Sequence, residues 1–244
     1  MAAPIQNPSG SLYVAVSAGP RHTCALTTTG AVDCWGANSY GQLNGDPGGA
    51  GNAFFTAGGS WTPIRIAALA DARIISAGYR HNCAIRADGT EACWGEKEHG
   101  ATLLQPGLGN LLAIAAGGGD TCVVDAGGVA RCWGSNIDFQ IGSLAVSDWP
   151  GAGPTFMRTP AAIPIPGVVA VSAGLRTTCV ATNLGEAYCW GGNFAGEAGN
   201  GRSRGDANPF TGESDFSFVD GASPWRLSLP ARVASPSGSA GGAP

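Results

Sequence analysis

The sequence predicts an all-β protein built from four copies of a short antiparallel sheet. A 23-residue frame occurs four times without insertion or deletion, at residues 14–36, 73–95, 112–134 and 169–191. Each copy has an apolar run that ends in Ala-Gly, two cysteines ten residues apart, and a final Trp-Gly. Such regular repetition marks a repeat architecture. The 40 glycines and 16 prolines among 244 residues favour tight turns over helices.

The four frames and their links are expected to form a single repeat domain over residues 13–233. Residues 1–12 contain Pro, Gly and Ser without a periodic pattern, and we expect a flexible lead-in there. Residues 234–244 are rich in Gly, Ser, Ala and Pro, which is the composition of a disordered tail.

Each frame is expected to supply three antiparallel strands, which in the first copy are residues 14–18, 23–27 and 31–35. Alternation places Cys24 and Cys34 on one face and Trp35 on the other. The corresponding positions of the later copies are mostly apolar on both faces, which is typical of a sheet that is covered on both sides.

The cysteines predict four disulfides, each within one hairpin. All eight fall at a single spacing: Cys24 with Cys34, Cys83 with Cys93, Cys122 with Cys132, and Cys179 with Cys189. Pairing them leaves a three-residue tip that ends in glycine in every copy, at Gly30, Gly89, Gly128 and Gly185. A hairpin loop of this length requires a left-handed residue at its last position, which glycine supplies without steric cost.

Two alternatives for the cysteines stay open at this point. Structural zinc sites usually draw ligands two to four residues apart, and a spacing of ten does not match that pattern. Reduced cysteines would serve as small buried apolar residues. Four disulfides imply an oxidising compartment, so we expect a secreted, periplasmic or cell-surface protein. The start MAAPIQNPSG has neither a basic nor an apolar signal-peptide region, so we expect no signal peptide in this chain.

The links between the frames predict a fourth, edge strand for each sheet. Three links end in a similar short motif at residues 62–66, 159–163 and 223–227, whereas the second link offers only residues 101–105. Proline near the start of these motifs is tolerated on a sheet edge. The chain begins with a frame and ends, at residues 225–233, with an edge strand. We therefore expect the terminal strands to pair and close a ring of radial sheets, in preference to an open solenoid, which would require capping units.

Composition restricts the class of partner. Charged residues make up only 12% of the chain and the net charge is −4, so we expect no nucleic-acid partner. No apolar run reaches the roughly 18 residues that a membrane-spanning helix requires.

Residues 18–45, AGPRHTCALTTTGAVDCWGANSYGQLNG, carry a family resemblance. They resemble the repeat of the regulator of chromosome condensation (RCC1) family, with Asn38, Gly41, Gln42 and Leu43 matching best. The resemblance implies a β-propeller with four-stranded blades and a face that binds another protein. Members of the family commonly have seven blades, whereas this chain has four repeats, long links and paired cysteines.

We expect an extracytoplasmic binding module that recognises another protein through its links, without enzymatic activity, cofactor or metal. Aromatic residues in the links are the expected interface anchors, although they could instead pack as small clusters that fix the loops. These candidates are Phe54, Phe55, Trp61, Trp149, Phe156, Phe210, Phe216 and Phe218. The alternative is a structural subunit of a surface assembly or filament, with self-association.

A less favoured hypothesis is a hydrolase whose site lies at the axis of the ring. One frame position holds His22, His81, Asp120 and Thr177, which could approach a shared metal. The preceding position holds Arg21, Arg80 and Arg176, either as a partial basic ring or as ordinary turn residues. The tryptophan of each frame is expected to be structural rather than a chromophore.

Overall fold

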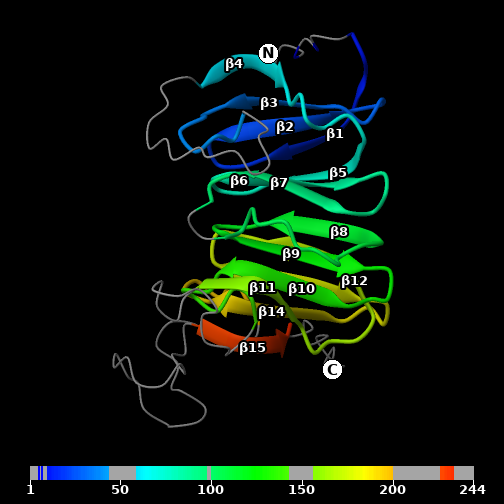
Figure 1. The fold of residues 1–244 in the computed structure, drawn as a ribbon. Coiled ribbons are helices and arrows are strands. Elements are labelled where there is room, and N and C mark those ends of the chain that lie inside the picture. Colours follow the sequence, from blue (N-terminus) through cyan, green and yellow to red (C-terminus); the bar gives the residue numbers. More distant parts are fainter. Residues whose placement is uncertain are drawn as a thin grey trace, which may run out of the picture.

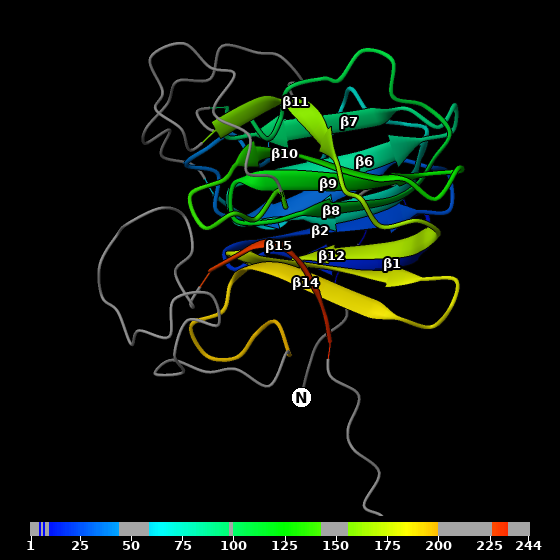
Figure 2. The ribbon, with the colours of Figure 1, turned by 90° about the horizontal axis from the view of Figure 1, so that it is seen from below.

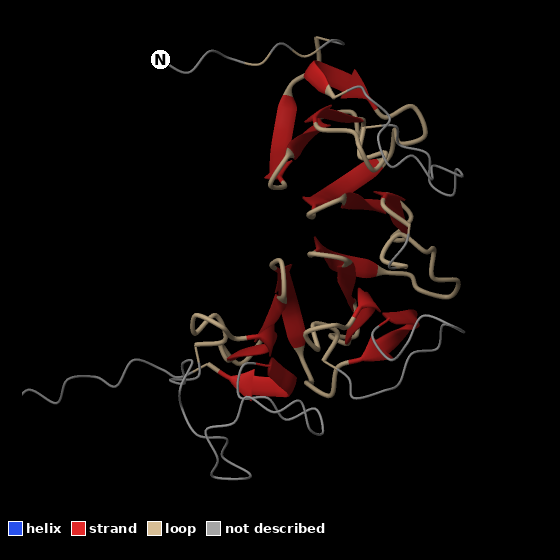
Figure 3. Ribbon diagram, turned by 90° about the vertical axis from the view of Figure 1, so that its left-hand side faces the viewer, coloured by secondary structure: helices blue, strands red, loops and turns tan. Residues whose placement is uncertain are grey.

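Four antiparallel sheets stack in chain order along an arc (Figures 1 and 3). The computed structural model describes residues 5, 7, 10–43, 59–97, 100–142, 156–199 and 226–233. We call the sheets blades I to IV. Within the described residues no helix is long and apolar enough to cross a membrane.

Each frame forms three consecutive strands, as expected, and a link adds a fourth to three of the blades. Blade I contains β1 (Tyr13–Ala18), β2 (His22–Thr27), β3 (Val32–Gly36) and β4 (Ser60–Arg65). Blade II contains β5 (Ala72–Ala77), β6 (His81–Arg86) and β7 (Glu91–Gly95). Blade III contains β8 (Leu111–Ala116), β9 (Asp120–Asp125), β10 (Ala130–Ser135) and β11 (Phe156–Ala162). Blade IV contains β12 (Val168–Ala173), β13 (Thr177–Thr182), β14 (Ala187–Gly192) and β15 (Arg226–Arg232).

The second and third strands of every blade are paired in the register that the cysteines predict. Cys24 lies opposite Cys34, and the same pairing recurs in the other blades. Four disulfides join these pairs, so the disulfide prediction is confirmed. The glycine at each hairpin tip has φ between 74° and 83°, as the turn requires.

The expected pairing of the terminal strands is wrong. β4 pairs with β3 of its own blade, through Asp33 with Arg65 and Cys34 with Ile64. β15 likewise pairs with β14. Each edge strand therefore completes the frame that precedes it, because a link that folds back on the last strand forms the nearest antiparallel pair. The arc is open between blades I and IV in the described part of the chain (Figure 3).

Blade II lacks the fourth strand expected at residues 101–105, and this prediction is also wrong. Local turns occupy this stretch: Leu103 N donates to Gly100 O at 3.0 Å and Leu108 N to Gln105 O at 3.1 Å. The side chain of Glu91, at the start of β7, accepts a hydrogen bond from Gln105 N at 2.7 Å. A side chain thus holds the link where the other blades have a backbone ladder.

The hydrophobic core lies between the blades, and every blade packs on the next in the same orientation. In each blade one face carries the two cysteines and the other carries the tryptophan; we call these the cysteine face and the tryptophan face. The cysteine face of blade I packs against the tryptophan face of blade II, and the same order holds between II and III and between III and IV. Figure 2 shows the strands running side by side across this stack.

The frame glycine after the first strand makes the tight contact between blades possible. A Cβ on Gly78 would lie 2.6 Å from Gly117 O, which real structures do not show, whereas a Cβ on Gly174 of blade IV would meet no atom closer than 3.4 Å. The two glycines occupy the same frame position. Of these two glycines, only Gly78, which lies at an internal joint, has no room for a side chain.

This difference predicts opposite outcomes for two matched substitutions. Gly78→Ala should destabilise the protein by about 1–3 kcal/mol, because the neighbouring backbone must move. Gly174→Ala should be neutral or stabilise by up to about 1 kcal/mol, since alanine reduces the entropy of the unfolded chain. Urea unfolding of both variants measures this, and equal free energies of unfolding would contradict the joint geometry.

Candidate functional site

The inner strands are joined from blade to blade by a repeated hydrogen bond. Ser17 Oγ accepts from Ala77 N at 2.9 Å, and Ser76 Oγ accepts from Ala116 N at the same distance. Blade III has Ala115 at the serine position, so its joint with blade IV lacks this bond. These contacts tie consecutive blades near the concave side of the arc.

Three of the four residues proposed for an axial metal site are directed to the next blade instead of to one another, and the fourth, Thr177, donates to Gly192 O of its own blade. His22 Nε2 lies 2.7 Å from Asn82 Oδ1, and His81 Nε2 lies 3.1 Å from Thr121 Oγ1. Asp120 is fully buried beside Thr178 of blade IV. Three separate joints therefore hold them, and in the described part of the chain no three His, Cys, Asp or Glu residues gather as metal ligands.

The frame tryptophans have a structural role at the same joints. The indole of Trp94 donates to Gln42 O at 2.9 Å, Trp133 to Ala101 O at 3.1 Å, and Trp190 to Gln140 O at 2.6 Å. Each acceptor belongs to the link that follows the preceding blade. These three tryptophans thus anchor the start of a link as well as filling the core.

Two of the three frame arginines have partners in the link of the preceding blade, so they do not form a free basic ring. The guanidinium of Arg80 lies 4.3 Å from the ring centre of Tyr40 and 3.2 Å from Glu96. Arg176 lies 3.4 Å from Asp138. Arg21, on blade I, is exposed.

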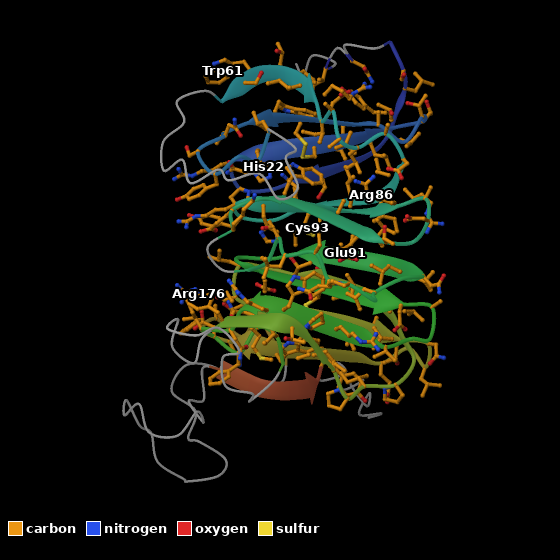
Figure 4. The ribbon with its side chains drawn as sticks, in the orientation of Figure 1. His22, Trp61, Arg86, Glu91, Cys93 and Arg176 are labelled. Atoms are coloured by element: carbon orange, nitrogen blue, oxygen red, sulfur yellow. A yellow bond between two sulfur atoms is a disulfide. The ribbon has the colours of Figure 1, made fainter. Side chains whose placement is uncertain are left out.

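The link aromatics are only partly within the described residues. Trp61, on β4, is 100% exposed and projects from blade I (Figure 4). Phe156, at the start of β11, is half-buried. Six further candidates lie outside the described residues: Phe54, Phe55, Trp149, Phe210, Phe216 and Phe218.

Trp61 borders a cavity of about 380 Å³ at the base of the first link. Its other lining residues are Arg21, Gly36, Ala37, Gly59 and Ser60. Three of these six residues come from the start of β4 and its approach, and the others from blade I beside the first link. An exposed tryptophan, an arginine and four small residues form a concave surface that suits an inserted side chain of a partner.

Comparison with known proteins identifies the repeat. A family model described as the regulator of chromosome condensation (RCC1) repeat matches residues 13–42 and 168–197, which are frames one and four with their flanks. The chain contains RCC1 repeats. Each match begins at the first strand of its blade, β1 or β12, and covers the three frame strands and the start of the link that follows.

The chain is similar in sequence to the human protein named probable E3 ubiquitin-protein ligase HERC6. The two are 37% identical over 108 residues, which cover 43% of this chain and 9% of HERC6.

Solved structures of yeast RCC1 and of a human protein share the fold. A chain in the structure of Kap60 bound to yeast RCC1 (Prp20) superposes with a TM-score of 0.71 at 20% identity, and covers 95% of this chain and 50% of that one. Human WBSCR16 gives a TM-score of 0.67 at 21% identity, with coverage of 95% and 55%. The chain thus spans about half the length of these structures.

Asp120 differs from the histidines at its RCC1 position in being an acid without a charged partner. Both carboxylate oxygens are buried without a hydrogen bond of good geometry. Burial raises the pKa of Asp120 to about 7, although the nearby amides of residues 118–120 and the Thr178 hydroxyl lower it in part. By contrast, burial lowers the pKa of His22, so both positions favour the neutral form.

The contribution of Asp120 to stability should therefore fall as pH rises from about 4 to 7. In this interval the unfolded chain has lost the Asp120 proton and the folded chain still holds it, so folding takes up a proton. The cost at pH 8 is at most about 4 kcal/mol for a shift of this size. Asp120→Asn should remove this pH dependence in urea unfolding at pH 5 and pH 8, whereas Asp88→Asn, at an exposed hairpin tip, should leave it in place.

Two features were not predicted from the sequence: the hydrogen bonds that shape the start of each link, and the uncovered outer faces of blades I and IV. Asn38 Oδ1 accepts from Leu43 N at 2.8 Å, and Asn193 Oδ1 accepts from Ala198 N at 2.9 Å. Both asparagines belong to the motif that carries the RCC1 resemblance. The motif was recognised in the sequence, but its role in accepting a backbone hydrogen bond within the link was not predicted. The uncovered end faces could not be predicted because they depend on the order in which the blades stack.

Proposed function

We propose that this RCC1-repeat protein is an extracytoplasmic binding module that holds another protein through its first link. The observation that carries the proposal is Trp61, which is fully exposed beside a cavity on a blade braced by a disulfide. Tryptophan and arginine dominate binding energy at protein interfaces. A rigid frame that positions an irregular link is the usual arrangement for recognition.

The four disulfides support a location outside the reducing cytoplasm, because such bonds persist in oxidising compartments. Similar RCC1 structures support protein binding as the type of activity. One is described as Kap60 bound to yeast RCC1, and another study of the yeast protein concerns its binding to Gsp1p and histones. Our proposal takes from these only that the partner is a protein.

Binding without catalysis is the form of activity that we propose. The polar residues nearest the concave side, His22, His81 and Asp120, are directed into joints between blades. Their side chains hold the frame together, which supports a structural role for them.

A site-specific cross-linking experiment tests the proposal. A photoreactive amino acid replaces Trp61, and the oxidised protein is incubated with secreted and surface proteins of the source cells. We expect one discrete cross-linked protein, which excess unmodified protein suppresses and excess Trp61→Ser protein does not. The same probe at Leu184, an 80% exposed residue at a hairpin tip of blade IV, is the matched control.

The outcome is unambiguous for the first link. Equal suppression by the Trp61→Ser protein, or identical cross-linked products from positions 61 and 184, would contradict recognition through this surface. The melting temperature of the Trp61→Ser variant should equal that of the parent, because the side chain buries no area.

A further inference from the structure

The arc has two different end faces. Because each cysteine face packs on the tryptophan face of the next blade, blade I presents a tryptophan face and blade IV a cysteine face that no blade covers in the described structure (Figure 3). The three internal joints show that these two kinds of face fit each other.

The tryptophan face of blade I exposes positions that are buried elsewhere. Trp35 is half-buried, whereas its counterparts in the other three blades are fully buried. Thr23 is half-buried, while Asn82 and Thr121 at the same frame position are inaccessible. Val16 is 68% exposed, compared with 7% for Ile114 at the same position of blade III. Ala25 and Asp33 of the same face are buried, Asp33 against Tyr13 and Arg65, so the face is open at Val16, Thr23 and Trp35. At these three positions it resembles a joint without its partner.

The cysteine face of blade IV shows the same difference. Cys179 and Thr177 are half-buried, although their counterparts in all three preceding blades are buried. Ala181 is half-buried at a position where the other blades bury Leu26, Ile85 and Val124, and Ala187 is half-buried where blade III buries Ala130. At the inner turn, the space beside Gly174 that another blade fills at Gly78 is open. Among the described residues, the face is largely apolar and open beside Gly174.

Charge at the rims of the two faces is complementary. At internal joints the frame arginine meets the preceding link, as Arg80 meets Tyr40 and Arg176 meets Asp138. On the end faces, Arg21 of blade I is exposed, and Glu197 is exposed in the link that follows the frame of blade IV. In the internal register Arg21 would face Ala195, which occupies the position of Tyr40 and Asp138, and the carboxylate of Glu197 accepts from the amide of that same residue, so the cation comes to the rim that holds the carboxylate.

An ion pair on the tryptophan face of blade I is compatible with such a joint. Asp33 is paired with Arg65 at this position. The corresponding residue of blade III, Arg131, is paired with Asp125 and lies within an internal joint. A charged pair at this outer position therefore does not prevent another blade from packing.

We propose that two copies of this chain bind head to tail, the cysteine face of blade IV in each against the tryptophan face of blade I in the other. Two such joints are related by a two-fold axis and close a ring of eight blades, within the range of about four to eight blades known for propellers. The occupant is a second copy because the surface that fits each face in this structure is the opposite face of the same repeat. The proposal is independent of recognition at Trp61.

Mass measurement of the oxidised full chain by light scattering and native mass spectrometry tests the ring. We expect a particle of twice the mass of one chain that does not grow with concentration. Val16→Arg on one face and Ala181→Arg on the other should each weaken dimerisation by at least about tenfold, because an unpaired charge would be buried. Both variants should retain the parental melting temperature within a few degrees, since neither residue is fully buried.

Val14→Arg is the matched control. Val14 lies on the same strand and is 59% exposed, but its position is exposed in every blade and carries Arg73 in blade II. The dimer should therefore be unchanged. Mixing the Val16→Arg and Ala181→Arg proteins should restore a one-to-one dimer, because one joint of the pair then keeps two unmodified faces.

A monomer at all concentrations, a polymer whose mass grows with concentration, a Val14→Arg protein as weak as Val16→Arg, or a mixture that stays monomeric would each overturn the proposal. None of these results depends on cross-linking at position 61, so the failure of either proposal is distinguishable from that of the other.

Discussion

Reducing the four disulfides is expected to unfold the protein at room temperature. Each bond closes a loop of ten residues within a hairpin, which is worth about 2–3 kcal/mol in the entropic model. The sum for four bonds is comparable with the whole free energy of unfolding of an ordinary folded protein, which is roughly 5–15 kcal/mol. Circular dichroism during thermal melting with and without dithiothreitol measures this, and a fall in melting temperature of only a few degrees would contradict it.

Removing one disulfide at a time provides the control. Replacing Cys122 and Cys132 by alanine should lower the free energy of unfolding more than replacing Cys179 and Cys189. The first pair lies fully buried in an internal joint, whereas Cys179 is half-buried on an end face. Equal losses would indicate that packing around the sulfur atoms contributes little.

The second large effect is expected for Trp133→Ala. The side chain is fully buried between blades II and III, and its indole donates to Ala101 O. Truncation should cost about 3–5 kcal/mol, because it leaves a large cavity. It also removes one of two hydrogen bonds to Ala101 O, the other coming from the Thr121 hydroxyl. Urea unfolding followed by far-ultraviolet circular dichroism reports the change.

Trp35→Ala is the matched control, since Trp35 occupies the same frame position in the half-buried setting of blade I. Its cost should be less than half that of Trp133→Ala in the monomeric Val16→Arg background, where the end face is free. Equal costs would show that the frame tryptophan stabilises its own blade instead of the joint.

The strands, the hairpin register and the disulfides could be predicted because they depend on local signals that agree. Two signals indicate the same pairing of Cys24 with Cys34: the spacing of ten residues between the cysteines, and the glycine at the third residue of the hairpin tip. The burial of both faces followed from strand positions that are mostly apolar on both faces. Such signals act within one frame and require no knowledge of its neighbours.

The joints could not be predicted in the same way, because they depend on which blade each link completes. The sequence contains an edge-strand motif after each of three frames, and assigning the last one to the first frame led to an expected ring that the strand pairing of β15 contradicts. The role of His22 as a joint residue was equally hidden, since its partner Asn82 is 60 residues away. Contacts between residues this far apart in the sequence are set by the order in which the blades stack, which no single frame encodes.

The most direct test of the account is peptide mapping of protein that has been alkylated without reduction. The account predicts no alkylated cysteine and four linked peptides, each joining the two cysteines of one hairpin. Eight alkylated thiols, or bonds that join cysteines of different blades, would contradict it.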